Sequence, residues 1–86
     1  MTQWTLEALT QRIFEILRGG LLRVSDDFTP QSNLVAAGLE SLTVTQLMLA
    51  IEESTGVWVD ESLLTPENLE NCWTLAACVH EQLRAA

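Results

Sequence analysis

One serine of this chain stands where a phosphate group is easily held. Ser41 lies in the run Gly38-Leu39-Glu40-Ser41-Leu42, between a long irregular segment and an amphipathic segment that we expect to be helical. A helix N-terminus presents free amides and the positive end of the helix dipole, so it accommodates an attached phosphate group. Gly38 allows a sharp turn just before the serine. The alternative is an ordinary N-cap, with the Ser41 hydroxyl bonded to the amide of Val44.

The remaining polar residues do not make a catalytic set. The chain has one histidine, His80, and neither lysine nor tyrosine. An enzyme site needs a nucleophile with a base, paired acids or metal ligands, and Ser41 and His80 are expected on separate helices. The pairs Asp26-Asp27 and Asp60-Glu61 lack the spaced oxygens and the glycine of a calcium loop. We therefore expect a protein that is not an enzyme and binds no metal.

The two cysteines are spaced for neither a metal site nor a disulfide. If Cys72 and Cys78 share one helix, they lie about 9 Å apart along its axis and on different faces. We expect both to be small buried apolar residues in a reducing compartment. The three tryptophans, Trp4, Trp58 and Trp73, are interpreted as core or rim aromatics.

Hydrophobic periodicity predicts an all-α fold, a four-helix bundle formed by a single domain over residues 1–86. The first predicted helix covers 4–17, with Thr2 or Thr5 as its cap and Gly19-Gly20 at its end, and the second covers 41–53. A short third helix has Thr65 as its N-cap. The fourth covers about 73–83, and its start is uncertain by a residue or two because Thr74 could be its cap. In the second helix Val44, Leu47, Met48 and Ile51 form the buried stripe, and Leu42 and Leu49 widen it.

The long first loop, residues 21–40, shows no sustained period. Turn and breaker residues are scattered through it, among apolar ones that we expect to point inward. We predict a short helical turn near residues 34–37.

The charge is strongly acidic and unevenly placed. Twelve acids oppose four arginines, for a net charge of −8, and no lysine or arginine lies between Val24 and Leu83. This composition argues against nucleic acid and against an anionic membrane surface, and favours basic protein partners. The N-terminus lacks the pattern of a signal peptide, and no segment has the ~20 apolar residues of a membrane span. We expect a cytoplasmic protein.

The run from Asn33 to Leu42, followed by Gln46-Leu47-Met48-Leu49-Ala50-Ile51-Glu52-Glu53, resembles the acyl carrier protein family. That family has a G-[LIM]-[DEH]-S-L motif, an amphipathic second helix and a following acidic pair. The resemblance covers the chain from end to end and implies the acyl-carrier type of four-helix bundle. It implies that 4′-phosphopantetheine, donated by coenzyme A through a phosphopantetheinyl transferase, is attached to Ser41, and that the thiol of this arm carries acyl or aminoacyl groups as thioesters.

The resemblance also implies a docking face on the second helix. Leu42 corresponds to a leucine that enters an apolar pocket on partner enzymes, Glu40 replaces a frequent aspartate, and Glu52 and Glu53 match the acidic pair. Thr43 and Gln46 belong to this expected face, where fatty-acid carriers usually have more acids. We expect cargo to fold back among Leu47, Ile51 and Val79.

These departures, together with Trp58, favour a dedicated carrier over housekeeping fatty-acid synthesis. Fatty-acid-like, polyketide-like, lipid-modifying and aminoacyl pathways stay open, although the residues around Gly38 and Met48 also look like carriers loaded by free-standing amino-acid ligases. The expected partners are the transferase, an acyl- or aminoacyl-loading ligase and a downstream synthase or transferase, and the chain is expected to be a monomer. The competing interpretation is an acidic helical adaptor in which Ser41 is only a cap.

Overall fold

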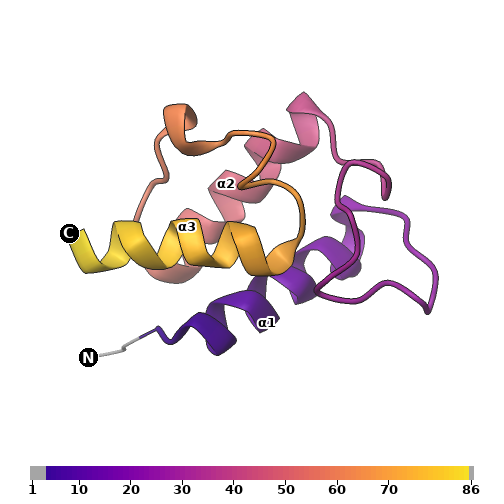
Figure 1. Ribbon diagram of the computed structural model, residues 1–86, viewed down its shortest axis with the longest axis horizontal. Coiled ribbons are helices and arrows are strands. Elements are labelled where there is room, and N and C mark those ends of the chain that lie inside the picture. Colours follow the sequence, from indigo (N-terminus) through magenta and orange to yellow (C-terminus); the bar gives the residue numbers. More distant parts are fainter. Residues whose placement is uncertain (1–3, 86) are drawn as a thin grey trace.

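Three α-helices surround one hydrophobic core in the computed structural model, which describes residues 4–85 (Figure 1). They are α1, Leu6–Ile16; α2, Ser41–Thr55; and α3, Cys72–Ala85. Leu17–Leu21 form a π-helical turn and Glu61–Leu63 a 3₁₀ turn, and no strand occurs in this range. The all-α prediction is confirmed, whereas a fourth helix is not.

Helix α1 begins two residues later than predicted, and Thr5 is its N-cap, whereas Thr2 lies outside the described residues. The Thr5 hydroxyl accepts a hydrogen bond from the amide of Ala8 at 3.1 Å, and Glu7 lies in the first turn, favourable for the helix dipole. The helix widens into the π-helical turn, and Gly20, with φ at +147°, ends it. Its buried face, which includes Leu9 and Ile13, packs more extensively against α3 than against α2.

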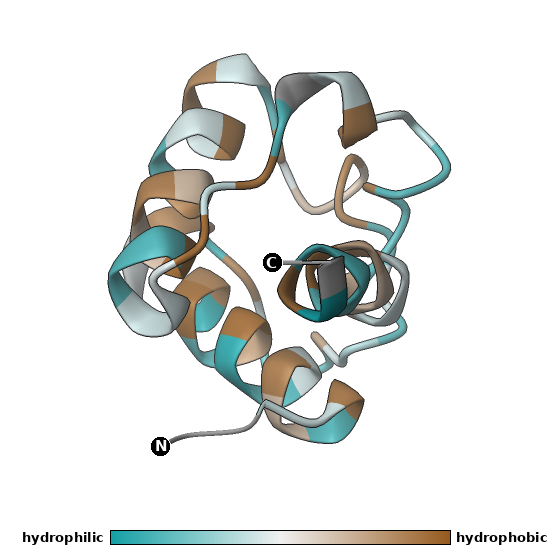
Figure 2. Cartoon of the chain, turned by 90° about the vertical axis from the view of Figure 1, so that its left-hand side faces the viewer, coloured by the Kyte–Doolittle hydropathy of each residue, from teal (hydrophilic) through white to brown (hydrophobic). Residues whose placement is uncertain are grey.

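Helix α3 packs mainly against α1 and has one fully buried face. Figure 2 shows it nearly end-on, with other parts of the chain around it. Cys72, Leu75, Ala76 and Val79 are each 0% exposed, because neighbouring segments cover these positions. None of the helices between residues 4 and 85 combines the length and apolarity needed to cross a membrane.

The long loop contributes to the core, as its scattered apolar residues predict. Four of them are buried: Leu22, Phe28, Leu34 and Leu39. The ring of Phe28 stacks on that of Phe14 from α1, with ring centroids 5.4 Å apart. This inward packing compensates for the lack of regular structure in the loop.

The predicted third helix is a single turn. The Thr65 hydroxyl accepts from the amide of Asn68 at 3.2 Å, and the Thr65 carbonyl accepts from the amide of Leu69 at 2.9 Å, so the predicted cap is present. A continuing helix would pair the Cys72 amide with the Asn68 carbonyl. Instead that carbonyl accepts from the Thr74 hydroxyl at 3.1 Å, and the Cys72 amide bonds elsewhere. The turn therefore stops.

Helix α3 starts one residue earlier than predicted. Asn71 accepts from the amide of Thr74 through Oδ1 at 2.9 Å, and the Thr74 hydroxyl accepts from the amide of Asn71 at 3.1 Å. This reciprocal pair is a capping box with threonine in the place of glutamate. Thr74 is therefore a partner of the cap within the helix, and Asn71 is the cap.

Candidate functional site

The segment that leads to Ser41 starts with one helical turn, as predicted near residues 34–37. The Asn33 side chain accepts a hydrogen bond from the amide of Ala36 at 2.8 Å, and the Asn33 carbonyl accepts from Ala37 at 3.1 Å. Asparagine is a favourable residue at such a start because its side-chain oxygen satisfies a free amide. The turn therefore has a defined beginning.

The same turn ends at Gly38. The Leu34 carbonyl accepts from the amide of Leu39 at 2.9 Å, and the Val35 carbonyl accepts from the amide of Gly38 at 3.0 Å. This pair of bonds is the Schellman pattern of a helix end, which favours glycine because φ is positive there. Gly38 has a φ of +107°. The chain turns sharply here, and Leu39 then enters the core at 7% exposure.

Two backbone hydrogen bonds fasten this loop to the start of α3. The amide of Leu34 donates to the carbonyl of Glu70 at 2.8 Å, and the amide of Cys72 donates to the carbonyl of Pro30 at 3.0 Å. The loop before Ser41 is thus held by a distant part of the chain, as well as by its own turn.

Ser41 is the first residue of α2 and is exposed. The N-cap is Glu40, in an extended conformation with φ −138° and ψ 177°, and its side chain makes no capping hydrogen bond. The Glu40 carbonyl accepts from the amide of Val44 at 2.8 Å, which closes the first helical turn. The interpretation of Ser41 as a simple N-cap bonded to Val44 is therefore wrong.

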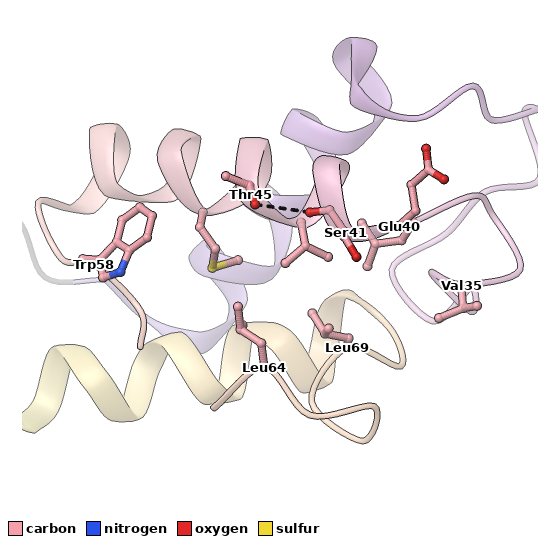
Figure 3. Close-up of a pocket in the computed structure, with 10 residues that line it drawn as sticks. Val35, Glu40, Ser41, Thr45, Trp58, Leu64 and Leu69 are labelled. Atoms are coloured by element: carbon pink, nitrogen blue, oxygen red, sulfur yellow. Dashed lines mark hydrogen bonds between the residues drawn. The ribbon is translucent and has the colours of Figure 1, made fainter. Parts of the chain in front are cut away.

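The start of α2 suits a bound anion. No acid lies in its first turn, and the first amides of a helix have no partner within the helix. Thr45, one turn later, donates its hydroxyl to the Ser41 carbonyl at 3.2 Å (Figure 3). The hydroxyl of Ser41 thus lies beside unpaired amides and the positive end of the α2 dipole.

An apolar pocket of about 410 Å³ adjoins Ser41. It lies between α2 and the segment that joins α2 to α3, and Figure 3 shows Leu64 and Leu69 across from the helix. Its lining residues are Val35, Leu39, Glu40, Ser41, Val44, Thr45, Met48, Trp58, Leu64 and Leu69.

This pocket differs from the predicted cargo site. Leu47, Ile51 and Val79 do not line it and are 0%, 2% and 0% exposed in the core. Helix periodicity identifies them as buried but does not distinguish core from pocket. Sequence reasoning missed Val35, Leu64 and Leu69 as pocket residues, and their only signal was apolar character inside irregular segments.

The outer face of α2 presents most of the predicted docking residues. Glu40, Leu42, Gln46, Glu52 and Glu53 are all exposed, as their proposed role requires.

Two expectations for this helix are corrected. Thr43 is 8% exposed and lies on the core side, so it is not available for docking. Leu42 and Leu49 do not widen the buried stripe, because they are 67% and 51% exposed. Together with Gln46 and Glu53, they follow the i, i+4, i+7, i+11 spacing of a single exposed face.

Of the two cysteines that the sequence predicts to be buried, only Cys72 is fully buried. Cys72 is 0% exposed, and burial raises the pKa of its thiol to about 11. Burial also raises the pKa of the Cys78 thiol, although this side chain is only half-buried. Both thiols are free, as predicted. Across the part of the chain that the structure describes, no cluster of three possible metal ligands occurs.

Comparison with known proteins identifies related chains. Residues 11–80 match the family described as "Phosphopantetheine attachment site". Aminoacyl carrier protein 1 of Bradyrhizobium diazoefficiens is 36% identical over 77 residues, which cover 87% of this chain and 86% of that protein.

Two solved structures are also similar. One is an engineered Bradyrhizobium japonicum glycine:[carrier protein] ligase complexed with a carrier protein from Agrobacterium tumefaciens and ATP; the match has a TM-score of 0.67 at 32% identity, over 83% of this chain and 95% of that one. The other is the Bradyrhizobium japonicum ligase complexed with glycylated carrier protein, with a TM-score of 0.60 at 27% identity, over 85% and 95%.

The residues at the start of α2 fit the group that this family carries. An exposed hydroxyl, unpaired helix amides and an adjoining apolar pocket match a phosphate ester followed by a largely uncharged arm. The cofactor is 4′-phosphopantetheine, and the chain serves as a carrier of thioester-bound groups and not as an enzyme. This chain belongs to the phosphopantetheine-attachment family of carrier proteins.

Proposed function

We propose that Ser41 is the attachment residue for 4′-phosphopantetheine and that this carrier transports aminoacyl groups. The observation that supports the attachment best is the placement of Ser41. It is the first residue of α2, it is exposed and it lines the pocket, and no side chain caps the helix there. The motif around it and its position inside the matched region, 11–80, agree with this assignment.

The attachment is a phosphoryl transfer that a separate transferase catalyses. Ser41 Oγ forms a bond to the phosphorus that carries pantetheine, and the pyrophosphate bond of coenzyme A breaks. Adenosine 3′,5′-bisphosphate leaves, and the hydroxyl proton passes to a base of the transferase. In this chain, the Gly38 turn presents the hydroxyl, and the start of α2 stabilises the phosphodiester that results.

Aminoacyl cargo is supported by the relatives. A curated relative is named an aminoacyl carrier protein, and similar structures hold carrier proteins with a glycine:[carrier protein] ligase. The attached arm supplies a thiol that holds cargo as a thioester. We therefore expect an amino-acid ligase to load this chain, and a downstream transferase or synthase to unload it.

The exposed face of α2 is the proposed docking surface for these enzymes. Leu42 and Leu49 form its apolar centre, with Gln46 between them. Glu40 lies at one end and Glu52 and Glu53 at the other, so a matching partner surface has an apolar patch flanked by cations. Monomeric state and cytoplasmic location stay predictions from the sequence.

Intact mass measurement tests the attachment residue. The purified protein is incubated with coenzyme A and a broad-specificity phosphopantetheinyl transferase. The wild type should gain one phosphopantetheine, and Ser41→Ala should gain none. Ser25→Ala, which removes an exposed hydroxyl from the long loop, is the matched control and should gain one. Modification that persists in Ser41→Ala would rule out this assignment.

A second step tests the cargo. The modified carrier is presented with ATP and an amino-acid ligase of the glycine type, and separately with an acyl ligase and short fatty acids. We expect mass gain with the amino acid. Loading by the acyl ligase alone would contradict the aminoacyl proposal and leave the attachment assignment intact.

A further inference from the structure

The pocket beside Ser41 has an accessible aromatic side chain at its far end. Trp58 lines the pocket and is 44% exposed. Figure 3 shows it at the opposite end from Glu40 and Val35. Met48 also lines the pocket, seven residues after Ser41 on α2, so the pocket extends about 10 Å along the helix from the serine.

The end of the pocket at Trp58 is favourable for a positive charge. Among the described residues, Glu40 is the only charged one in the lining, and it lies at the opposite end from Trp58. Glu52 lies about one helical turn beyond Met48 on α2 and is exposed. No lysine or arginine lies between Val24 and Leu83. A cation placed here would find an indole ring and no repelling side chain on α2.

We propose that Trp58 receives the protonated amino group of an aminoacyl cargo, and that the pocket accommodates the arm that bears it. This inference rests on the proposed function. Tryptophan is the aromatic side chain best suited to a cation on its face. The apolar side chains of Val44, Leu64 and Leu69 offer contacts for the uncharged middle of the arm.

The lengths are compatible. From phosphorus to sulfur the arm contains about thirteen bonds, the length of roughly four extended residues or about 14 Å. This exceeds the distance of about 10 Å from Ser41 to the level of Met48. An arm attached to Ser41 therefore extends past the level of Met48, toward the end of the pocket that Trp58 lines.

The inference makes Trp58 a residue that distinguishes cargo by charge. A glycyl group and a propionyl group have the same number of heavy atoms, and they differ in that an ammonium replaces a methyl. The apolar part of the pocket treats them alike, whereas Trp58 favours the glycyl group.

Nuclear magnetic resonance of the loaded carrier tests this. The transferase attaches the bare, glycyl or propionyl arm, and intact mass confirms the load in each sample. The indole N–H signals of Trp4, Trp58 and Trp73 are assigned with single Trp→Phe variants. We expect the Trp58 signal to differ between the glycyl and propionyl forms. The Trp73 signal should not change, since this 38% exposed residue does not line the pocket.

The cargo provides the second measurement. With ¹³C-labelled glycine, the α-protons should be shifted by the ring current of Trp58, and this shift should be lost in Trp58→Leu and kept in Trp73→Leu. If Trp58→Leu is misfolded by circular dichroism, the comparison of glycyl and propionyl arms on the wild type still decides. Equal Trp58 signals in those two forms would overturn the inference. A Trp58 signal unchanged by any confirmed load would also overturn it while leaving the Ser41 assignment standing.

Discussion

Helices α2 and α3 both begin with a residue that could act as a nucleophile, and the structure exposes only one of them. Ser41, the first residue of α2, is exposed, whereas Cys72, the first residue of α3, is 0% exposed. Asn71 and Thr74 cap α3 reciprocally, and the Cys72 amide is paired with the Pro30 carbonyl. At α2, no side chain caps the helix.

The two helix starts differ in whether the protein itself supplies partners for their first backbone amides. At α3, the protein satisfies its own amides and gains a stable, buried helix start. At α2, the amides stay available to an anion, and this arrangement costs stability because a cap would contribute about 1 kcal/mol. The loop before Ser41 holds α2 in place by other means, through the Gly38 turn and the bond from Leu34 to Glu70.

The largest expected effect comes from Leu34, which connects the two helix starts. Its side chain is 0% exposed, and its amide bonds Glu70 just before α3. Leu34→Ala should lower the free energy of unfolding by about 2–4 kcal/mol, because it leaves a cavity under both starts. Urea denaturation measures the loss. Val35→Ala, at a neighbouring side chain that is 65% exposed, should change stability by less than about 0.5 kcal/mol. Equal losses at the two positions would mean that Leu34 does not connect the helix starts as described.

Gly38 affects the α2 start alone. Its φ of +107° is unfavourable for any residue with a Cβ, so Gly38→Ala should cost about 1–3 kcal/mol and slow the modification of Ser41. The control is Gly19→Ala, where φ is not positive and a Cβ would meet no atom within 4 Å. That change should be neutral or stabilising by up to about 1 kcal/mol. The modification rate and the thermal midpoint are measured for both. An unaffected rate in Gly38→Ala would show that the turn does not position Ser41.

Periodicity and turn chemistry predicted much of this arrangement. Thr5 at the start of α1, the helical turn at 34–37 and the sharp turn at Gly38 all follow from local hydrogen bonding and glycine conformation, which short stretches of sequence encode. The start of α2 at Ser41 was predicted for the same reason.

The features that were missed depend on distant parts of the chain. The turn at Thr65 does not become a helix because Pro30 takes the Cys72 amide and Thr74 takes the Asn68 carbonyl. Similarly, the spacing of Leu42 and Leu49 cannot show that no segment covers them. Tertiary contacts determine where the turn at Thr65 ends and which side chains of α2 are covered, and the local sequence pattern does not encode those contacts.

A smaller difference in stability is expected between variants of the two N-cap residues, Asn71 of α3 and Glu40 of α2. Asn71→Ala removes the side-chain oxygen that accepts the Thr74 amide and should lower stability by about 1 kcal/mol. Glu40→Ala removes no capping bond, so its effect should stay within about 0.5 kcal/mol. Neither variant should prevent modification of Ser41 by the transferase. A larger loss in Glu40→Ala than in Asn71→Ala would reverse the comparison of the two helix starts.

The two helix starts can be compared by the reactivity of a cysteine thiol at the first residue of each helix. In a Cys78→Ala background, Ser41→Cys places an exposed thiol at the first residue of α2, while Cys72 stays at the first residue of α3. A helix N-terminus alone lowers a thiol pKa. At Cys72, burial outweighs that effect and raises the pKa to about 11, so at pH 8 only about one thiol in a thousand is ionised.

Iodoacetamide at pH 8 should therefore alkylate the introduced cysteine at least about a hundredfold faster than Cys72, as measured by peptide mass mapping. The rate at Cys72 should rise about tenfold for each pH unit up to about pH 11, because the thiolate is the reactive form and its fraction grows as pH approaches the raised pKa. If Cys72 instead reacts within tenfold of the introduced thiol at pH 8, the start of α3 must open readily in solution. The exposure of Ser41 would then no longer distinguish the start of α2 from that of α3.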